Sequence, residues 1–305
     1  MICTGQSDRD TVARAAKTAR LRARLALEFE HSGLSGRTIL AARQQQPPLR
    51  VVRAFPLEDG AALVHLHNVS GGLLGGDALE LEIRVGAGAQ AQVTTTGGTR
   101  IYRPKPGALP ATQTTEISVA ENALLEYVPD PLIPFAGARF AQRTTIQLAS
   151  GAGLFWWEIV APGREACGEV FAYESIEWAT DLSVSGRLVA AEQARVEPQR
   201  FSPAHSARMG AHRYVATFFI CREGLDARFW LATEEKLRGV AASFDLDGDH
   251  ESGALWGVST LAAHGLVVRG LSPHGFGMMA GLRALWCAAK EMLYGREPIW
   301  PRKVN

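Results

Sequence analysis

Three groups of residues in this sequence have types and spacing that could support chemistry. The first is the glycine-rich segment Gly71-Gly72-Leu73-Leu74-Gly75-Gly76-Asp77. Its four glycines permit left-handed backbone angles and close approach of neighbouring chain segments. It lacks the Lys-Ser/Thr ending of a phosphate-binding P-loop and the Gly-x-Gly-x-x-Gly order of a dinucleotide site. The segment therefore predicts a turn between strands, in which Asp77 hydrogen-bonds to the loop.

The second group is a pair of histidines, His65 and His67, separated by one residue. On a β-strand this spacing places both rings on one face, where they could serve as two metal ligands. A third ligand would have to come from elsewhere in the chain. Two half-exposed strand histidines are the commoner outcome for such a pair, so both interpretations stay open.

The third group consists of four glutamates in a region of short predicted strands: Glu158, Glu169, Glu174 and Glu177. Paired carboxylates are the catalytic groups of glycosidases, but this spacing identifies no acid and nucleophile pair. Arg143 and Arg164 could equally neutralise these glutamates in ion pairs. The Gly-x-Ser-x-Gly and Ser-x-x-Lys nucleophile motifs are also absent from the sequence. Two alternatives remain: a β-solenoid polysaccharide-active enzyme that uses Glu158 and Glu169, and a simple β-type binding module.

Length and charge restrict the class of protein further. The chain has 305 residues, of which 47% are hydrophobic, so it can bury a large core. Its 32 Lys and Arg nearly balance 31 Asp and Glu, which gives no electrostatic reason to bind nucleic acid or anionic lipid. No apolar run is long enough to span a membrane, and the first twenty residues lack the apolar region of a secretory signal. We therefore expect a cytoplasmic protein without nucleic-acid or membrane partners.

Alternation of apolar and polar residues predicts β-strands along most of the chain. The clearest example is Leu21 to Phe29, where every second residue is apolar. Leu154 to Val160 is instead apolar on both faces, which is typical of a central strand, and Glu158 within it is predicted to be a buried carboxylate that needs partners. Further strands are predicted at residues 79–85, 89–93, 114–119, 124–128, 143–148, 170–178 and 214–221.

Helix signals are few. Ser272-Pro273 has the form of an N-cap followed by proline at the first helical position, and apolar residues then recur at three- and four-residue steps up to a stop at Gly295. A shorter helix is predicted from Thr233 to Ala241. No period of fixed length recurs. The sequence thus predicts a flexible tail at 1–20 and a single mostly-β domain at 21–305, with a small helical element near the C-terminus.

Four segments, taken in order, resemble the family of the urease accessory protein UreD, also called UreH. They are residues 65–77, Thr94-Thr95-Thr96-Gly97-Gly98-Thr99-Arg100-Ile101-Tyr102-Arg103, the run from Leu125 to Arg139 with Pro129-Asp130-Pro131 at its centre, and Trp157-Glu158-Ile159-Val160-Ala161-Pro162-Gly163-Arg164 followed by Gly168-Glu169. The resemblance extends from about Leu21 to Pro298-Ile299-Trp300-Pro301-Arg302. The chain departs from the family at Val69-Ser70, where a Pro-Pro pair is common, and at Pro162, where Leu is common.

The resemblance implies a fold, a role and partners. It implies a β-helix-like stack of short strands with a small helical element, and no catalytic activity. The implied role is maturation of urease: such proteins bind UreF, which recruits the GTPase UreG. The assembly docks on apo-urease and helps to load two Ni²⁺ ions and a carbamylated lysine, with UreE supplying nickel upstream. No permanently bound cofactor is implied, and Ni²⁺ would be bound only transiently.

The same motifs provide candidates for a transient nickel path. A few oxygen and imidazole ligands release nickel more readily than a closed thiolate cage does, and carboxylates lower the cost of moving a divalent cation through protein. The candidates are Asp77, Glu126, Asp130, Glu158 and Glu169, with His65 as a weaker one. The alternative for each is a buried ion pair or a turn contact. Residues expected to support the motifs structurally, or to pair with these carboxylates, are Gly71, Gly72, Gly75, Gly76, Arg100, Tyr102, Arg103, Arg139 and Arg164.

The apolar stripe of the C-terminal helix also has two interpretations. Its residues are Phe276, Met279, Trp286 and Met292. Such a stripe commonly covers the core of its own domain. Because Met and aromatic residues are also enriched at protein interfaces, part of this face is alternatively predicted to bind UreF.

Overall fold

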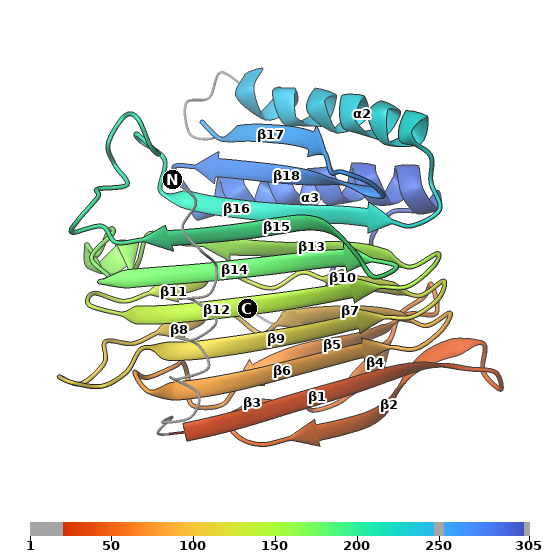
Figure 1. The fold of residues 1–305 in the computed structure, drawn as a ribbon, viewed down its shortest axis with the longest axis horizontal. Coiled ribbons are helices and arrows are strands. Elements are labelled where there is room, and N and C mark those ends of the chain that lie inside the picture. The colour runs from red at the N-terminus through yellow and green to blue at the C-terminus, as the bar shows by residue number, and fades with distance from the viewer. Residues whose placement is uncertain (1–20, 247–252, 302–305) are drawn as a thin grey trace.

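In the residues that the structure describes, two β-sheets and two α-helices make up the fold, with a short 3-10 helix at Glu165–Cys167 (Figure 1). The structure, a computed structural model, describes residues 21–246 and 253–301, so the predicted tail at 1–20 lies outside the described residues. The first sheet has seven strands in the order β15-β14-β12-β9-β6-β1-β2. These strands are β1 (Leu21–Ser32), β2 (Arg37–Gln45), β6 (Asp77–Val85), β9 (Ala111–Val119), β12 (Arg139–Leu148), β14 (Ser175–Val184) and β15 (Arg187–Val196).

The second sheet has eleven strands, eight of them in the order β17-β18-β16-β13-β10-β7-β5-β3. The short strands β4, β8 and β11 pair beside this path. The members are β3 (Leu49–Arg50), β4 (Ala54–Pro56), β5 (Ala62–Asn68), β7 (Gln90–Thr95), β8 (Thr99–Ile101), β10 (Leu124–Tyr127), β11 (Leu132–Pro134), β13 (Gly153–Val160), β16 (Tyr214–Arg222), β17 (Leu255–Thr260) and β18 (Gly265–Ser272).

Between β5 and β14 the chain winds as a β-helix. It passes from one sheet to the other and returns to lay each new strand parallel to an earlier one, so that Ala78, Thr112 and Ala141 align across β6, β9 and β12. The first of these turns advances the chain by 34 residues and the second by 29. Because the turns differ in length, the sequence has no fixed period. The predicted mostly-β, β-helix-like fold is confirmed.

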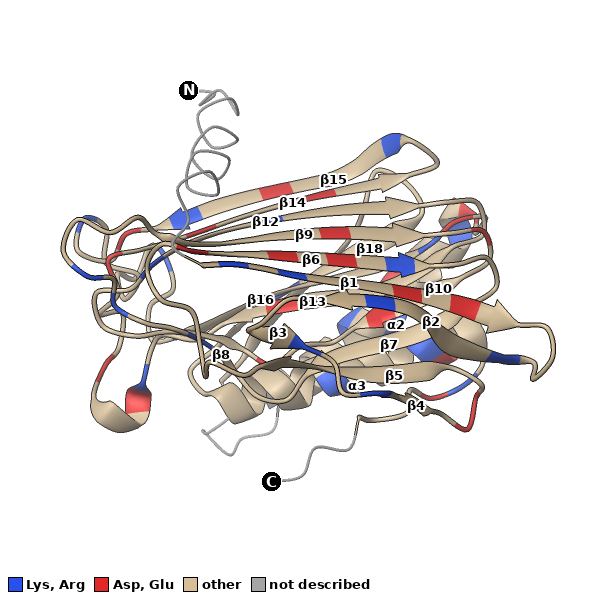
Figure 2. Ribbon diagram, turned by 90° about the horizontal axis from the view of Figure 1, so that it is seen from below, with Lys and Arg blue, Asp and Glu red and all other residues tan. Residues whose placement is uncertain are grey.

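The apolar residues that recur at every second position of the predicted strands are buried between the two sheets. In β1, Leu25, Leu27 and Phe29 are buried there, while charged side chains alternate with them on the outer face. Figure 2 shows acidic and basic residues interspersed along the strands of the first sheet. β13 is buried on both faces, as predicted: Trp156 contacts the core between the sheets, and Trp157 contacts the core under the helices. Each large side chain buried in this way contributes about 1.5–3 kcal/mol.

Helices α2 (Ala227–Leu246) and α3 (Gly275–Tyr294) pack on the second sheet, and α3 lies behind it in Figure 1. The N-terminus predicted at Pro273 is wrong: α3 begins at Gly275, because the Ser272 hydroxyl holds the backbone of His274 in the turn before the helix. The predicted stop is confirmed, since Gly295 is left-handed (φ 64°) and its N–H donates to Glu291. Neither helix in the described ranges is long and apolar enough to cross a membrane.

Two predicted boundaries differ from the structure. The helix predicted at 233–241 begins at Ala227, because the Asp226 carboxylate accepts the backbone N–H of Phe229 and so satisfies a donor of the first turn. The strand predicted at 170–178 begins only at Ser175. Before it, Phe171 has a positive φ of 53°, which is incompatible with an extended strand.

Candidate functional site

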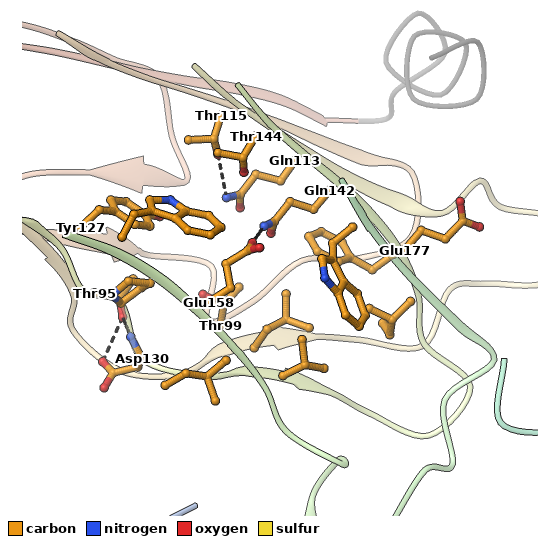
Figure 3. Close-up of a pocket in the computed structure, with 18 residues that line it drawn as sticks. Thr95, Thr99, Gln113, Thr115, Tyr127, Asp130, Gln142, Thr144, Glu158 and Glu177 are labelled. Atoms are coloured by element: carbon orange, nitrogen blue, oxygen red, sulfur yellow. Dashed lines mark hydrogen bonds between the residues drawn. The ribbon is translucent and has the colours of Figure 1, made fainter. Parts of the chain in front are cut away.

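Two neighbouring cavities between the sheets bring the sequence motifs together. We call the first the carboxylate cavity, because Asp130, Glu158 and Glu177 line it; its volume is about 60 Å³ (Figure 3). The second is the glycine cavity, lined by the glycine pairs 71–72 and 97–98, with a volume of about 250 Å³. Both cavities are bordered by the same four residues: Thr95, Thr99, Gln113 and Tyr127.

Polar side chains at inward strand positions surround the carboxylate cavity. Gln113 and Thr115 follow the inward alternation of β9, and Gln142 and Thr144 follow that of β12. Thr115 and Thr144 are buried, at 2% and 1% exposure. Apolar residues would fill such positions in an ordinary sandwich core. None of these residues was predicted from the sequence, although glutamine at an inward position of an alternating strand is the signal that could have identified them.

Glu158 projects from β13 into the carboxylate cavity, and the Gln142 side-chain amide donates a hydrogen bond to its Oε1 (Figure 3). The residue as a whole is half-buried, but its carboxyl group is enclosed by protein. Burial, together with the negative charge of Glu192, raises the pKa of Glu158 to about 8, while the Thr180 hydroxyl opposes the shift. The carboxyl group therefore holds a proton at neutral pH.

Asp130 reaches the same cavity from the loop after β10. The Thr95 hydroxyl donates to its Oδ2 at 2.9 Å, while the Asp130 backbone N–H donates to the Thr95 hydroxyl oxygen at 2.8 Å. This reciprocal pair fixes the loop against β7. Glu177 of β14 borders the cavity, but its carboxylate points away from Glu158 (Figure 3) and lies 3.3 Å from Arg195. No Lys, Arg or His is among the described residues that line the cavity, so its walls favour a cation over an anion.

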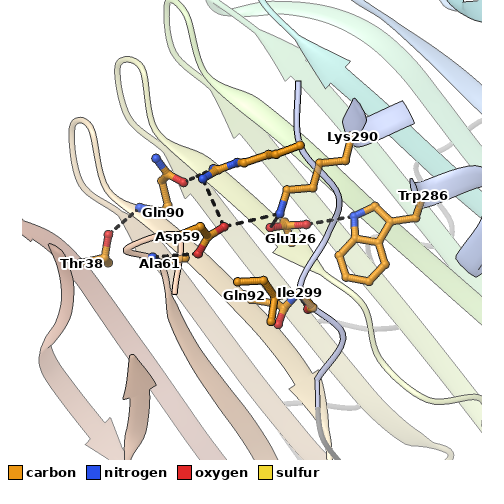
Figure 4. Close-up of polar contacts among 10 residues, drawn as sticks. Thr38, Asp59, Ala61, Gln90, Gln92, Glu126, Trp286, Lys290 and Ile299 are labelled. Carbon is orange, nitrogen blue, oxygen red and sulfur yellow. Dashed lines mark hydrogen bonds and ion pairs between the residues drawn. The ribbon is translucent and has the colours of Figure 1, made fainter. Parts of the chain in front are cut away.

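Glu126 lies on the opposite face of the second sheet, in contact with α3 (Figure 4). The Trp286 indole N–H donates to it at 2.9 Å, and the Lys290 ammonium lies 2.7 Å from its other oxygen. Lys290 is fully buried and is also 3.7 Å from Asp59. Burial raises the pKa of Glu126, and Lys290 opposes the shift. Glu126 therefore forms a buried ion pair, which was the alternative to a role in a nickel path, and it lines neither cavity.

The remaining nickel candidates also lie away from the cavity walls. Asp77 accepts the backbone N–H of Leu74 at 2.9 Å and so makes the predicted turn contact. Glu169 is ion-paired with Arg164 and accepts the N–H of Ala136 at 3.0 Å; hydrogen bonding from Arg164 lowers its pKa. The geometry therefore does not bring Glu158 and Glu169 together as the pair that a polysaccharide-active enzyme would need.

The two histidines have different surroundings. His65 packs edge-on against the ring of Phe55, with 5.9 Å between the ring centroids, whereas His67 borders the glycine cavity. Within the described ranges, no three His, Cys, Asp or Glu side chains are grouped so that they could hold a metal ion. A His65–His67 metal site with a third ligand is therefore not formed by these residues.

The glycine-rich segment packs so closely against residues 100–104 that side chains at two of its glycines would clash. A Cβ at Gly72 would lie 2.6 Å from the Arg100 carbonyl oxygen and from the Tyr102 ring, and a Cβ at Gly75 would lie 2.2 Å from Pro104. The Tyr102 hydroxyl donates to the Gly71 carbonyl at 3.1 Å. Gly71 and Gly76 have left-handed backbones, with φ of 80° and 87°. The Arg103 side chain packs against Gly137, so its contact is also structural.

The apolar stripe of α3 is divided between surface and core. Phe276 is 88% exposed, whereas Met279 and Met292 are half-buried against the core under the helices. Trp286 is fully buried against Trp157, with ring centroids 5.5 Å apart. The prediction that Trp286 contributes to a partner surface is therefore wrong, because its ring and its N–H are both used inside the chain.

The amino-acid sequence is similar to proteins of one known family. The sequence model of the family described as UreD urease accessory protein matches residues 21–305. A protein of Herpetosiphon aurantiacus is 45% identical over 95% of this chain and 99% of its own length. Proteins of Deinococcus radiodurans and Pseudomonas aeruginosa are 32% and 33% identical over 91% and 92% of this chain, which cover 94% and 93% of their lengths. All three are named urease accessory protein UreD.

Proposed function

The chain belongs to the UreD family of urease accessory proteins, and on that premise we propose that it assists assembly of the nickel metallocentre of apo-urease. In this proposal the chain has no turnover of its own. It acts as a scaffold that receives Ni²⁺ and passes it on, with nickel as cargo rather than as a resident cofactor. The observation that carries the proposal is the carboxylate cavity.

Three properties of the cavity support transient binding of nickel. Two carboxyl-bearing residues, Asp130 from the loop after β10 and Glu158 from β13, line it together with Glu177 of β14. Hydroxyl and amide oxygens of the surrounding Thr and Gln residues can replace part of the hydration shell of a divalent ion. No thiol is among the lining residues described, and an oxygen-ligand site of this kind holds Ni²⁺ weakly enough to release it.

The protonation of Glu158 would further weaken the hold on nickel. Since the pKa of this carboxyl group is raised to about 8, a nickel ion that binds it near neutral pH must displace a proton. The proton competes with the metal, so affinity is lower than for a carboxylate with an ordinary pKa. Lower affinity favours onward transfer over retention.

The proposal includes the partners implied by the family. UreF would bind this chain directly and bring UreG to it; the assembly would dock on apo-urease, and UreE would supply nickel indirectly. The exposed Phe276 at the start of α3 is the candidate contact residue, because aromatic residues are enriched at protein interfaces.

Reconstitution of urease tests the proposal. Apo-urease, UreE, UreF and UreG are combined with limiting nickel, with and without the full chain. Urease activity and urease-bound nickel are expected to rise only when the chain is present. Equal nickel content and activity without it would contradict the proposed function.

A further inference from the structure

The glycine cavity has the opposite electrostatic character from the carboxylate cavity beside it. Among the described residues that line it there is no Asp or Glu, whereas Arg100 and His67 both border it. The Arg100 guanidinium makes no ion pair with any described residue. A carboxylate-free cavity that has an exposed arginine among its lining residues favours an anion.

Asn68 supplies a donor that lacks an acceptor. Its Oδ1 accepts two hydrogen bonds from Ser70, from the backbone N–H at 3.1 Å and from the hydroxyl at 2.6 Å. These bonds fix the orientation of the amide and leave Nδ2 as its free donor. Nδ2 is buried and has no partner in the part of the chain that the structure describes. A buried donor without an acceptor is unfavourable by about 1–3 kcal/mol, so this atom indicates a ligand with an acceptor oxygen.

Backbone N–H groups add further donors around the cavity. Within residues 21–246 and 253–301, the N–H groups of Gly72, Gly97 and Gly98 donate to no protein acceptor. Gly72 is buried, and the absence of a side chain there is required because a Cβ would lie 2.6 Å from the Arg100 carbonyl oxygen. Gly97 is exposed and Gly98 half-buried, so solvent or a bound ion can accept from them, and unpaired backbone donors that line a concave surface are groups suited to oxyanions.

From this geometry we propose that the glycine cavity binds a small inorganic oxyanion of the carbonate or phosphate class. The amide of Asn68 and the glycine N–H groups would donate to its oxygens, and Arg100 would neutralise its charge. A volume of about 250 Å³ accommodates such an ion with part of its hydration shell. The site is separate from the carboxylate cavity, and the inference holds whether or not nickel passes through that cavity.

Amide NMR of the full chain tests this proposal. Bicarbonate and inorganic phosphate are titrated in separate experiments, each against chloride at matched ionic strength. We expect saturable shifts of the Gly97 and Gly98 amide resonances and of the Asn68 side-chain NH₂ with at least one oxyanion, and none with chloride. Saturation with bicarbonate alone would assign a trigonal ion, and saturation with phosphate alone would assign a tetrahedral one.

Two variants separate a built site from general charge attraction. Asn68→Asp keeps the acceptor oxygen for Ser70 but replaces the buried donor with a negative charge, so oxyanion binding should fall at least tenfold. Arg100→Gln should weaken it by a similar factor. The matched control is Arg103→Gln, which removes a nearby positive charge that does not line the cavity, and it should leave binding within twofold.

Absence of saturation with both oxyanions would overturn the proposal. So would equal weakening by Arg100→Gln and Arg103→Gln, because the shifts would then report only the overall charge of this end of the molecule. Each variant is checked for parent-like thermal unfolding before titration. If Asn68→Asp fails to fold, Arg100→Gln and its control decide the outcome alone.

Discussion

Glu126 and Tyr127 are neighbours on β10, and their side chains point to opposite faces of the second sheet. Glu126 is held by Trp286 and Lys290 of α3, while the Tyr127 ring stacks on Trp156 and borders both cavities. Adjacent residues of β10 therefore contact α3 on one face of the sheet and the two cavities on the other face. The alternation of side chains along a β-strand makes this arrangement obligatory once β10 is central.

The Glu126–Lys290 pair predicts a large stability effect. Lys290→Met leaves the buried Glu126 carboxylate without its cation, and we expect the free energy of unfolding to fall by about 3–5 kcal/mol. Urea unfolding followed by tryptophan fluorescence measures this loss. The double variant Glu126→Gln/Lys290→Met should recover part of it, because no uncompensated charge remains. A loss below about 1 kcal/mol in Lys290→Met would show that the pair contributes little.

Glu158 predicts a pH dependence of stability. Its pKa is raised to about 8 in the folded chain, so the folded state retains a proton that the unfolded chain releases near pH 4.5. The contribution is fully present below about pH 4.5 and is lost as pH rises towards 8, with a slope of at most about 1.4 kcal/mol per pH unit. Glu158→Gln should remove this part of the slope in urea unfolding between pH 5 and 8. The exposed Glu174→Gln is the control, and equal slopes in parent and Glu158→Gln would refute the prediction.

Close packing of the glycine motif predicts a position-specific effect. Gly72→Ala places a Cβ 2.6 Å from the Arg100 carbonyl oxygen, so we expect about 1–3 kcal/mol of destabilisation in chemical denaturation. Gly97→Ala is the matched control, because a Cβ there has no atom within 4 Å and its backbone is not left-handed. Similar losses in the two variants would mean that chain flexibility, and not packing, sets the cost.

Phe276 predicts a surface effect without a stability effect. Because its side chain is 88% exposed, Phe276→Ser should leave the free energy of unfolding within about 0.5 kcal/mol of the parent. If this residue is an anchor of the UreF contact, the variant should bind UreF at least tenfold more weakly in an equilibrium binding assay. Glu291→Gln, at an exposed position near the other end of α3, serves as the control. Unchanged affinity in Phe276→Ser would place the UreF contact elsewhere.

Local patterns were sufficient to predict much of the fold. Alternation at 21–29 predicts β1, and the run at 154–160 predicts a strand buried on both faces, because burial of a strand face depends on residue type at every second position. The N-terminus of α3 could not be placed from Ser272-Pro273, since the Ser272 hydroxyl is used by the preceding turn. The extent of α2 was underestimated because the Asp226 cap was not recognised.

The candidate site was predictable only in part. Asp130 and Glu158 do line one cavity, and both belong to motifs that the sequence makes visible. The role of Glu126 could not be read from the sequence, because its partner Lys290 lies 164 residues away and meets it only after α3 packs on the sheet. Gln113 and Gln142 were predictable in principle from their inward positions on alternating strands.

The most direct test of the account is the nickel content of urease after reconstitution at limiting nickel with a chain altered in the carboxylate cavity. The double variant Asp130→Asn/Glu158→Gln keeps the shape of the cavity and removes two of its carboxyl groups. We predict parent-like folding and at least a tenfold lower rate of nickel incorporation, whereas Glu174→Gln should match the parent. Parent-like incorporation by the folded double variant would contradict the claim that nickel passes through this cavity.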